Sequence, residues 1–242
     1  MSNVSIADYA LLSDCHSAAL VSRMGAVDWL CFPRFDAPSV FGRLLDERAG
    51  HWCIRPVGEA DSRRRYVENT LVLETTFTTA NGVAVLIDAM ATGQNDRGHQ
   101  LGAESPHALL RSVRCAEGEV ELEMEFAPRF EYGLVYPLLA EVESGIRARG
   151  GASYMLLSSP VPIALEESTG QARFRLKAGE RLLSVCSIVP PGSSPAKLGI
   201  SKQSVAASRT RSRLGEAGRS CTRIMKGLGR NSFCRAVAYC KA

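Results

Sequence analysis

The sequence predicts an all-β protein, a large antiparallel two-sheet sandwich, followed by a basic C-terminal tail. Short apolar runs recur between turn residues, and Asn81-Gly82 separates two runs rich in β-branched residues, which is the strongest short hairpin signal. Apolar residues alternate with glutamates over residues 118–126, so one sheet face is apolar and the other carries carboxylates. Repeated short strands favour a sandwich or barrel over alternating strands and helices.

The first pair of strands surrounds a tight turn. Apolar runs at residues 18–22 and 27–32 predict two strands, and a Met-Gly pair predicts the turn between them. Pro33 and Pro38 then enclose an Arg-Phe-Asp triplet. Each proline fixes its own φ and disfavours helix in the preceding residue, so we expect an extended, irregular loop braced on both sides.

The segments between residues 39 and 65 are expected to form one short helix, one strand and one turn. Ser39 is expected to cap a helix that ends at Leu45, with its apolar side chains on one side. Alternation over residues 50–56 predicts a strand. The basic run Arg63–Arg65 is interpreted as a solvated turn.

The remaining segments predict hairpins and single strands. Residues 70–79 and 83–89 predict one hairpin, and residues 107–115 and 118–126 predict another. The polar, Gly-rich residues 92–105 predict an exposed loop. Four more strands are expected, the last two joined by an Ala-Gly-Glu turn: residues 146–149, 153–158, 172–177 and 181–189.

Composition divides the chain into two regions. A hydrophobic content of 45% over 242 residues suffices for one large core. From Lys197 onward there are eleven Lys or Arg residues and one acid, which leaves 18 basic and 24 acidic residues, a net charge of −6, in residues 1–196. We therefore expect a mildly acidic β domain over residues 1–196 and a separate basic tail over residues 197–242.

The sequence lacks the marks of a membrane or secreted protein. No apolar run approaches the length of a membrane-spanning helix, and the N-terminus lacks a basic and then apolar signal segment, so we expect a cytoplasmic location and no membrane partner. The eight cysteines show neither a C-x-x-C pair nor zinc-finger spacing. Four of them lie inside apolar runs, where we expect small buried side chains: Cys31, Cys53, Cys115 and Cys186.

The candidate functional residues lie in the proline-braced loop and in the strand before it. Loops held by a rigid scaffold often carry recognition residues. An Arg-Asp pair beside aromatic rings suits sugar hydroxyls and the apolar faces of sugar rings. The alternative is structural, with the rings anchoring the core and the arginine pairing with either aspartate. The candidates for substrate binding or for a domain interface are Asp28, Trp29, Pro33, Arg34, Phe35 and Asp36.

No catalytic residue is assigned. Nucleophile-elbow, Walker A, zinc-protease and dinucleotide-binding motifs are absent from the sequence, and the four histidines are scattered. Catalysis by paired carboxyl groups needs two of them on a common cleft, and Asp28 and Asp36 are the only carboxylates in the proline-braced loop and the strand before it. The glutamates of residues 119–125 are explained by a water-facing sheet surface. We therefore expect no metal ligand and no cofactor.

Residues 20–45 carry a resemblance to a known family. They read L-V-S-R-M-G-A-V-D-W-L-C-F-P-R-F-D-A-P-S-V-F-G-R-L-L and resemble the opening of glycoside hydrolase family 15 proteins of the trehalase and glucoamylase type. Met24, Ala26 and Ala37 stand where that family usually has Asp, Ser and Ser. The resemblance extends over roughly residues 5–190. Further matching motifs follow in the same order: Arg65-Tyr66, residues 70–77, Asp88-Ala89-Met90, residues 105–110 and residues 126–129.

The resemblance implies a fold, a parent activity and a partner. The family has a large antiparallel sandwich here, and its two catalytic glutamates lie in a later (α/α)6 barrel that hydrolyses α-glucosidic bonds. We expect the chain to end before that barrel and not to hydrolyse sugars alone. The loop of residues 29–36 is expected to pack on the barrel or edge its cleft, which predicts an exposed apolar patch. The alternative is a stand-alone carbohydrate-binding module for trehalose or an α-glucan.

The tail over residues 201–242 does not resemble the family. Its basic residues lack a helical face and interleaved aromatic rings, so we expect no nucleic-acid binding. When the last base of each codon is read with the first two of the next, Met225-Lys226 becomes Glu. With permitted codon choices, the string from Ser204 onward spells R-x-R-L-E-D-T-V-A-A-W-R-S-W-E-E-L-H-Q-N-Y-E-G-P-W, which resembles the family's linker helix. We therefore hypothesise a frameshift near residues 195–204.

Overall fold

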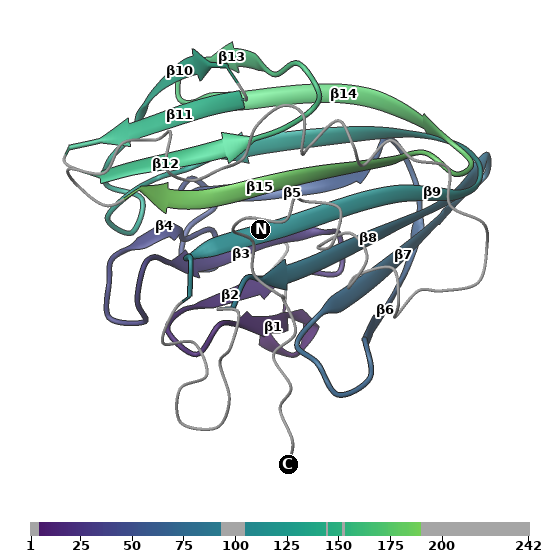
Figure 1. Cartoon of the computed structure of the whole chain (residues 1–242), viewed down its shortest axis with the longest axis horizontal. Coiled ribbons are helices and arrows are strands. Elements are labelled where there is room, and N and C mark those ends of the chain that lie inside the picture. The colour runs from purple at the N-terminus through teal and green to yellow at the C-terminus, as the bar shows by residue number, and fades with distance from the viewer. Residues whose placement is uncertain (1–4, 93–104, 144, 152, 190–242) are drawn as a thin grey trace, which may run out of the picture.

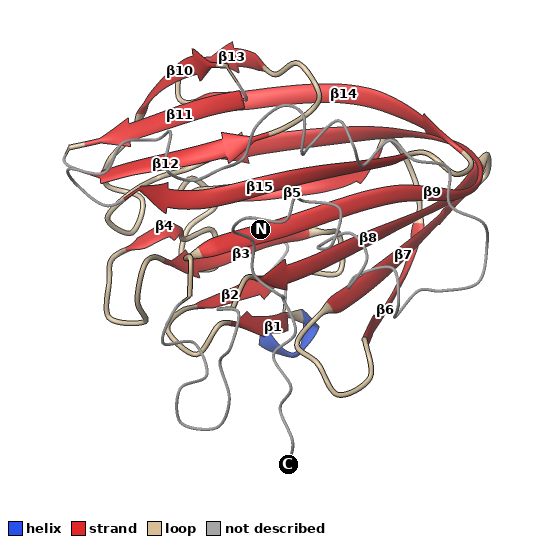
Figure 2. Ribbon diagram, viewed as in Figure 1, coloured by secondary structure: helices blue, strands red, loops and turns tan. Residues whose placement is uncertain are grey.

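Antiparallel strands make up nearly all of the regular secondary structure in the described chain (Figures 1 and 2). The computed structural model describes residues 5–92, 105–143, 145–151 and 153–189. Within these ranges no helix is long and apolar enough to cross a membrane. The elements are η1 (Ile6–Asp8), a 3-10 turn, and the strands β1 (Ala10–Ser13), β2 (Ala18–Val21), β3 (Ala26–Cys31), β4 (Ser39–Phe41), β5 (His51–Pro56), β6 (Asp61–Tyr66), β7 (Leu73–Thr79), β8 (Gly82–Met90), β9 (Ala108–Ala127), β10 (Leu138–Val142), β11 (Gly145–Gly150), β12 (Ser153–Ser158), β13 (Ala164–Glu166), β14 (Thr169–Lys177) and β15 (Arg181–Val189).

The strands form one hydrogen-bonded network that passes through β9. Half A contains β1, β2, β3, β4, β5, β13 and β14, and half B contains β6, β7, β8, β10, β11, β12 and β15; β9 belongs to both. Every pairing is antiparallel, so the predicted all-β antiparallel class is confirmed. The structure adds that both halves share a single continuous network (Figure 1).

Strand β9 joins the halves because it continues through 20 residues. Its first part pairs with β8 and β15, and its second part pairs with β5 and β14. The predicted hairpin over residues 107–126 is therefore wrong. Gly118, at φ +66°, lies at the bend, but its neighbouring backbone groups bond to other turns: Glu119 N donates to Asn81 O at 3.1 Å, and Cys115 N donates to Glu180 O at 3.0 Å.

The main core takes side chains from both halves. Trp52 and Phe126 of half A are fully buried, as are Phe77 and Leu109 on the strands of half B. The rings of Trp52 and Phe126 meet edge to face, with centroids 6.0 Å apart, a favoured aromatic geometry. Burial of these large rings supplies the main driving force for closing the two halves on each other.

A buried ion pair crosses this core. Arg111 (β9) and Asp88 (β8) are both 0% exposed, and Arg111 Nε donates to Asp88 Oδ1 at 2.9 Å. The two other guanidinium nitrogens donate to backbone oxygens of half A: Nη1 to Trp52 O at 2.6 Å and Nη2 to Gly25 O at 2.7 Å. A buried charge is tolerated only when paired and hydrogen-bonded, and Arg111 meets both conditions while tying half B to half A.

Most of the strands predicted from sequence are present. The hairpin predicted around Asn81-Gly82 is present as β7–β8: Ala80 and Asn81 form its turn, and Gly82 begins β8 opposite Thr79. The last four predicted strands correspond to β11, β12, β14 and β15. All four cysteines expected to be buried are buried. The loop over residues 92–105 and the tail over residues 197–242 lie outside the described residues, except for Thr92 and Ser105.

Two predicted segments differ from the structure. The helix expected over residues 39–45 is wrong: residues 39–41 form β4, where Phe41 pairs with Leu30 of β3, and turns follow. Ser39 is fully buried in that strand, so it caps no helix. The basic run Arg63–Arg65 lies in β6, paired with β7, instead of in a turn. In both cases pairing with the neighbouring strand in the sequence overrides the local preference.

Candidate functional site

The loop of residues 32–38 connects β3 to β4. The peptide bond between Phe32 and Pro33 is cis. Phe35 N donates to the carbonyl oxygen of His16 at 2.8 Å, and Ala37 N donates to Arg34 O at 3.1 Å. The loop is thus fixed to the β1–β2 turn and closed on itself. It presents the ring of Phe35, which is 58% exposed.

Arg34 and Asp36 pair at the tip of this loop. Arg34 Nε donates to Asp36 Oδ1 at 2.9 Å and Nη2 donates to Oδ2 at 3.1 Å, which lowers the pKa of the Asp36 carboxyl. Of the two aspartates considered from sequence, Arg34 therefore pairs with Asp36. Because both side chains are exposed, the pair adds little stability, and its groups remain accessible to a partner or ligand.

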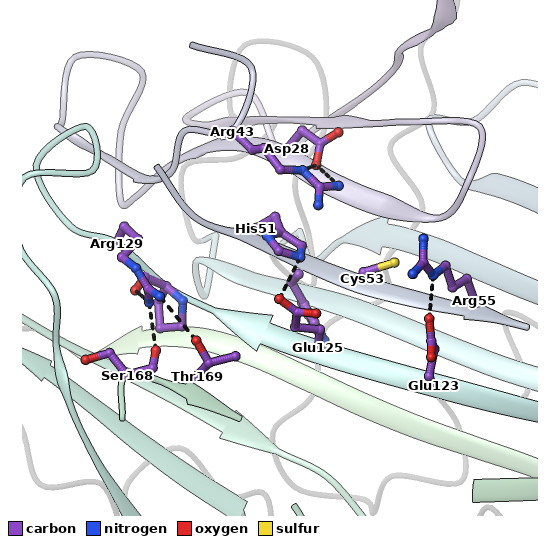
Figure 3. Close-up of polar contacts among 12 residues, drawn as sticks. Asp28, Arg43, His51, Cys53, Arg55, Glu123, Glu125, Arg129, Ser168 and Thr169 are labelled. Carbon is purple, nitrogen blue, oxygen red and sulfur yellow. Dashed lines mark hydrogen bonds and ion pairs between the residues drawn. The ribbon is translucent and has the colours of Figure 1, made fainter. Parts of the chain in front are cut away.

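Asp28 lies beneath the loop and out of reach of solvent. It is 2% exposed and accepts hydrogen bonds from Tyr9 Oη at 2.9 Å and Arg43 Nε at 2.7 Å (Figure 3). Burial raises the pKa of Asp28 although Arg43 and Tyr9 oppose the rise. Burial and the adjacent carboxylate raise the pKa of Tyr9 to about 12. The geometry makes Asp28 a structural anchor that holds the segment around Arg43 against β3.

Trp29 connects this region to the segment between β9 and β10. It is half-buried, and its ring lies 6.3 Å from that of Tyr132, centroid to centroid. Tyr132 N donates to Ser39 O at 3.3 Å, so two distant segments meet beside the loop. The structure thus brings Trp29 next to the exposed loop, whereas Pro33 is half-buried at its base.

A second polar cluster anchors the loop from the other side. Asp14 is fully buried and accepts hydrogen bonds from His16 N at 3.0 Å, from Ser17 N at 2.7 Å and from the Ser105 hydroxyl. Burial opposes ionisation, but these bonds and the contact with His107 lower the pKa of Asp14. Sequence reasoning did not find this cluster, because nothing in the local pattern of either segment indicates that Asp14 and Ser105 meet.

The glutamates of β9 form ion pairs on the outer face of half A. Arg55 Nε lies 2.7 Å from Glu123 Oε1, and Arg175 Nη1 lies 3.2 Å from Glu119 Oε1 (Figure 3 shows the first pair). Arginines from the neighbouring strands β5 and β14 therefore pair with Glu119, Glu121 and Glu123 of the row of carboxylates predicted from the alternating sequence.

His51 lies at the end of this row, 3.4 Å from Glu125 through Nε2 and Oε1 (Figure 3). Burial, followed by the charges of Arg43, Arg129 and Arg55, lowers the pKa of His51 to about 3. His51 is therefore neutral near pH 7, and its contact with Glu125 is a polar contact of a neutral ring. This ring sits among cations, an arrangement that disfavours protonation.

The polar groups of this region are engaged with one another. Asp28 and Asp36 are both engaged by arginines, and no group of three or more His, Cys, Asp or Glu side chains in the described ranges is arranged to hold a metal ion. What the region presents to its surroundings is the Phe35 ring, the Arg34–Asp36 pair and the nearby ring of Tyr132.

Comparison with known proteins gives one family and several relatives. The family model described as "Trehalase-like, N-terminal" matches residues 1–178. The trehalase of Mycobacterium tuberculosis is 38% identical over 193 residues, 72% of this chain and 28% of that protein. The trehalase of Mycolicibacterium smegmatis is 39% identical over 195 residues, 73% of this chain and 29% of that protein. Trehalase 1 of Sulfolobus acidocaldarius is 39% identical over 150 residues, 60% of this chain and 24% of that protein. The chain thus spans less than a third of the length of these relatives.

Proposed function

Because this chain belongs to the trehalase-like N-terminal domain family, we propose that it is the non-catalytic β domain of a trehalase-type glycoside hydrolase. The single observation that carries the proposal is the match of residues 1–178 to that family, together with relatives that are trehalases more than three times as long as the matched segment. The parent reaction we propose is hydrolysis of the α-glucosidic bond of trehalose. The resemblance to glucoamylases makes α-glucans the second substrate class.

The catalytic groups are proposed to lie outside this domain. Cleavage of a glycosidic bond requires an acid and a base or nucleophile on the same cleft. Asp28 is buried under Arg43 and Tyr9, and Asp36 is held by Arg34 in a surface ion pair, so neither suits those tasks. The partner is the (α/α)6 barrel expected from the family resemblance. A cytoplasmic location remains a prediction.

The candidate residues divide between contact and support in this proposal. Arg34, Phe35 and Asp36 are exposed at the loop tip, where they contact the barrel or edge its cleft. Trp29 and Pro33 hold the loop from its base, and Asp28 anchors it through Arg43. The exposed Phe35 ring beside the Arg34–Asp36 pair supports contact with a protein surface, since aromatic rings and arginines are enriched at protein interfaces.

A chimera tests the proposal. In the first chimera, residues 1–189 of this chain replace the matching N-terminal part of the Mycolicibacterium smegmatis trehalase. In the control chimera, the N-terminal part of the Mycobacterium tuberculosis trehalase takes the same place. We expect both to hydrolyse trehalose within about tenfold of each other, because the domain supplies structure and not chemistry. An inactive chimera from this chain beside an active control would refute the assignment.

A second candidate function is carbohydrate binding by the isolated chain. The exposed Phe35 and Tyr132 rings near the Arg34–Asp36 pair favour it, because rings stack on sugars and charged groups bind hydroxyls. Calorimetric titration with trehalose and with maltoheptaose tests it. Binding that Phe35→Ala weakens at least tenfold supports this function, whereas no heat of binding rejects it.

A further inference from the structure

The segment between β9 and β10 exposes a row of large apolar side chains. Tyr132 is 48% exposed, Leu134 81%, Tyr136 54% and Leu138 77%. These four residues define the 132–138 ridge. Scattered apolar residues are normal on a surface, but four large ones within seven residues are a local concentration of exposed apolar side chains, which is typical of interaction sites.

The backbone of the ridge is held in place. Phe130 N donates to Val135 O at 2.9 Å, and Val135 N donates to Phe130 O at 3.0 Å. Phe130 is buried in the main core and Val135 packs against it, so the segment has an inward-facing anchor at each end of its turn. The exposed side chains are therefore presented by a fixed backbone, which reduces the entropy lost on binding.

Contacts at its side join the ridge to the candidate loop. Trp29 packs beside Tyr132, and Arg129 lies over the ring of Tyr136, with Cζ 4.4 Å from the centroid. Arg129 is itself fixed, because its Nη1 donates to Ser168 O at 2.7 Å (Figure 3). The ridge thus continues the surface that begins at the loop of residues 32–38.

The polypeptide leaves the described domain close to the ridge. Leu138 of β10 pairs with Arg149 of β11, Arg149 with Tyr154 of β12, and Tyr154 with Val189, the last residue of β15. These strands lie in that order in Figure 1. Three strand spacings, about 14 Å, therefore separate Val189 from Leu138 across the sheet.

We propose that the 132–138 ridge is the surface on which the C-terminal, catalytic part of a trehalase packs. This rests on the proposed function and names the docking surface that it requires. The matched share is less than a third of the length of these relatives, and Val189, the last described residue, lies three strands from Leu138 of the ridge. Arg129 and Arg149, each over a tyrosine ring, favour acidic side chains at the rim of the partner surface.

The side chains of the ridge favour a protein over a sugar as occupant. Its two most exposed members are Leu134 and Leu138, which offer neither a flat ring for a sugar face nor a hydrogen bond for a hydroxyl. Apolar side chains flanked by Tyr and Arg are typical of the centre of a protein–protein interface.

Binding in trans tests the ridge. The 242-residue chain is titrated calorimetrically with the separately expressed C-terminal part of the Mycolicibacterium smegmatis trehalase, and that enzyme's own N-terminal part serves as the positive control. The variant is Leu134→Asp with Leu138→Asp. The matched control is Ile6→Asp, because Ile6 is also 77% exposed but precedes β1, at the far end of the strand order from β10. Circular dichroism checks that both variants keep the β structure.

The possible results distinguish a failure of the ridge as the docking surface from a failure of the proposed function. We expect the double variant to bind at least tenfold more weakly and Ile6→Asp to bind like the unmodified chain. If the chain binds and the double variant binds equally well, the ridge is not the docking surface although the proposed function stands. If the positive control binds and the unmodified chain does not, both fail.

Discussion

Arg111 concentrates several interactions in one side chain. It pairs with Asp88 within half B, donates to two backbone oxygens of half A and lies 4.9 Å from the Trp52 ring centroid. All of these contacts are lost when the guanidinium is removed, and the carboxylate of Asp88 is then buried without a cation. Removal of Arg111 is therefore expected to destabilise the fold both by losing these contacts and by leaving the Asp88 carboxylate unpaired.

Replacing Arg111 should therefore be costly. We expect Arg111→Ala to lower the free energy of unfolding by about 3–5 kcal/mol, measured by urea denaturation. The control is Arg175→Ala, which removes an exposed ion pair with Glu119 and should cost less than about 1 kcal/mol. Equal losses for the two variants would contradict the role given to Arg111.

His51 should make the stability depend on pH. Its pKa falls from 6.5 to about 3 in the folded chain, so between these values the unfolded chain binds a proton that the folded chain does not. Stability is therefore lost as the pH falls. The contribution is roughly 1.5 kcal/mol between pH 6.5 and pH 5, a window above the titration of most carboxylates.

The measurement compares urea unfolding of the unmodified chain and of His51→Gln at pH 6.5 and pH 5. We expect the variant to lose less stability over this interval, by about the amount given above. An identical loss in both proteins would show that the ring of His51 is not shielded from protonation.

At the scale of single elements, β9 is the strand that joins the two halves of the fold. The sequence predicts strands over residues 107–115 and 118–126, which is correct, but it joins them as a hairpin, whereas they form one continuous strand. A local sequence cannot distinguish a turn from a bend within one strand. The difference lies in the partners: the backbone at this point bonds to Asn81 and Glu180, which come from other hairpins.

Two glycines in left-handed backbone give a matched test of this bend. A Cβ added to Gly118, at φ +66°, would overlap the carbonyl oxygen of Asn81, whereas one added to Gly179, at φ +86°, would meet no atom within 4 Å. We expect Gly179→Ala to cost about 1 kcal/mol from backbone strain alone and Gly118→Ala at least about 2 kcal/mol. Thermal unfolding measures both. A smaller loss at Gly118 than at Gly179 would contradict the bend.

Strands buried on both faces were easier to predict than strands at the edges. Both faces of β8 and β15 are apolar, with Leu86 and Cys186 in the main core and Val85 and Val185 in a second cluster, so their sequences are almost continuously apolar. The edge strand β6 carries three consecutive arginines, and only its pairing with β7 reveals it as a strand.

At the scale of the whole molecule, the sequence predicted the class and the region of interest but not the contacts that build it. The motif at residues 20–45 and the alternating runs were sufficient for the family resemblance and the all-β class. The meeting of Asp14 with Ser105, and of Trp29 with Tyr132, depends on how distant segments pack. The apolar patch expected beside the loop stays a prediction; apart from Phe35, the large exposed apolar side chains of this region lie in residues 132–138, which no local pattern indicated.

The basic tail leads to a prediction about the gene. If a frameshift near residues 195–204 produced residues 197–242, another reading frame of the same nucleotide sequence should continue without a stop codon. That frame should encode a linker and then a barrel. Sequencing of the locus and its downstream DNA tests this, and stop codons throughout the other two frames would exclude the frameshift.

We expect this β domain to bind and support a catalytic partner but not to cleave glycosidic bonds itself. The most direct measurement is the release of glucose from trehalose and from soluble starch by the purified 242-residue chain, with the Mycolicibacterium smegmatis trehalase as the active reference. We predict no release of glucose above the buffer blank at any pH at which the chain is folded. Glucose release that grows in proportion to the concentration of the purified chain would contradict it.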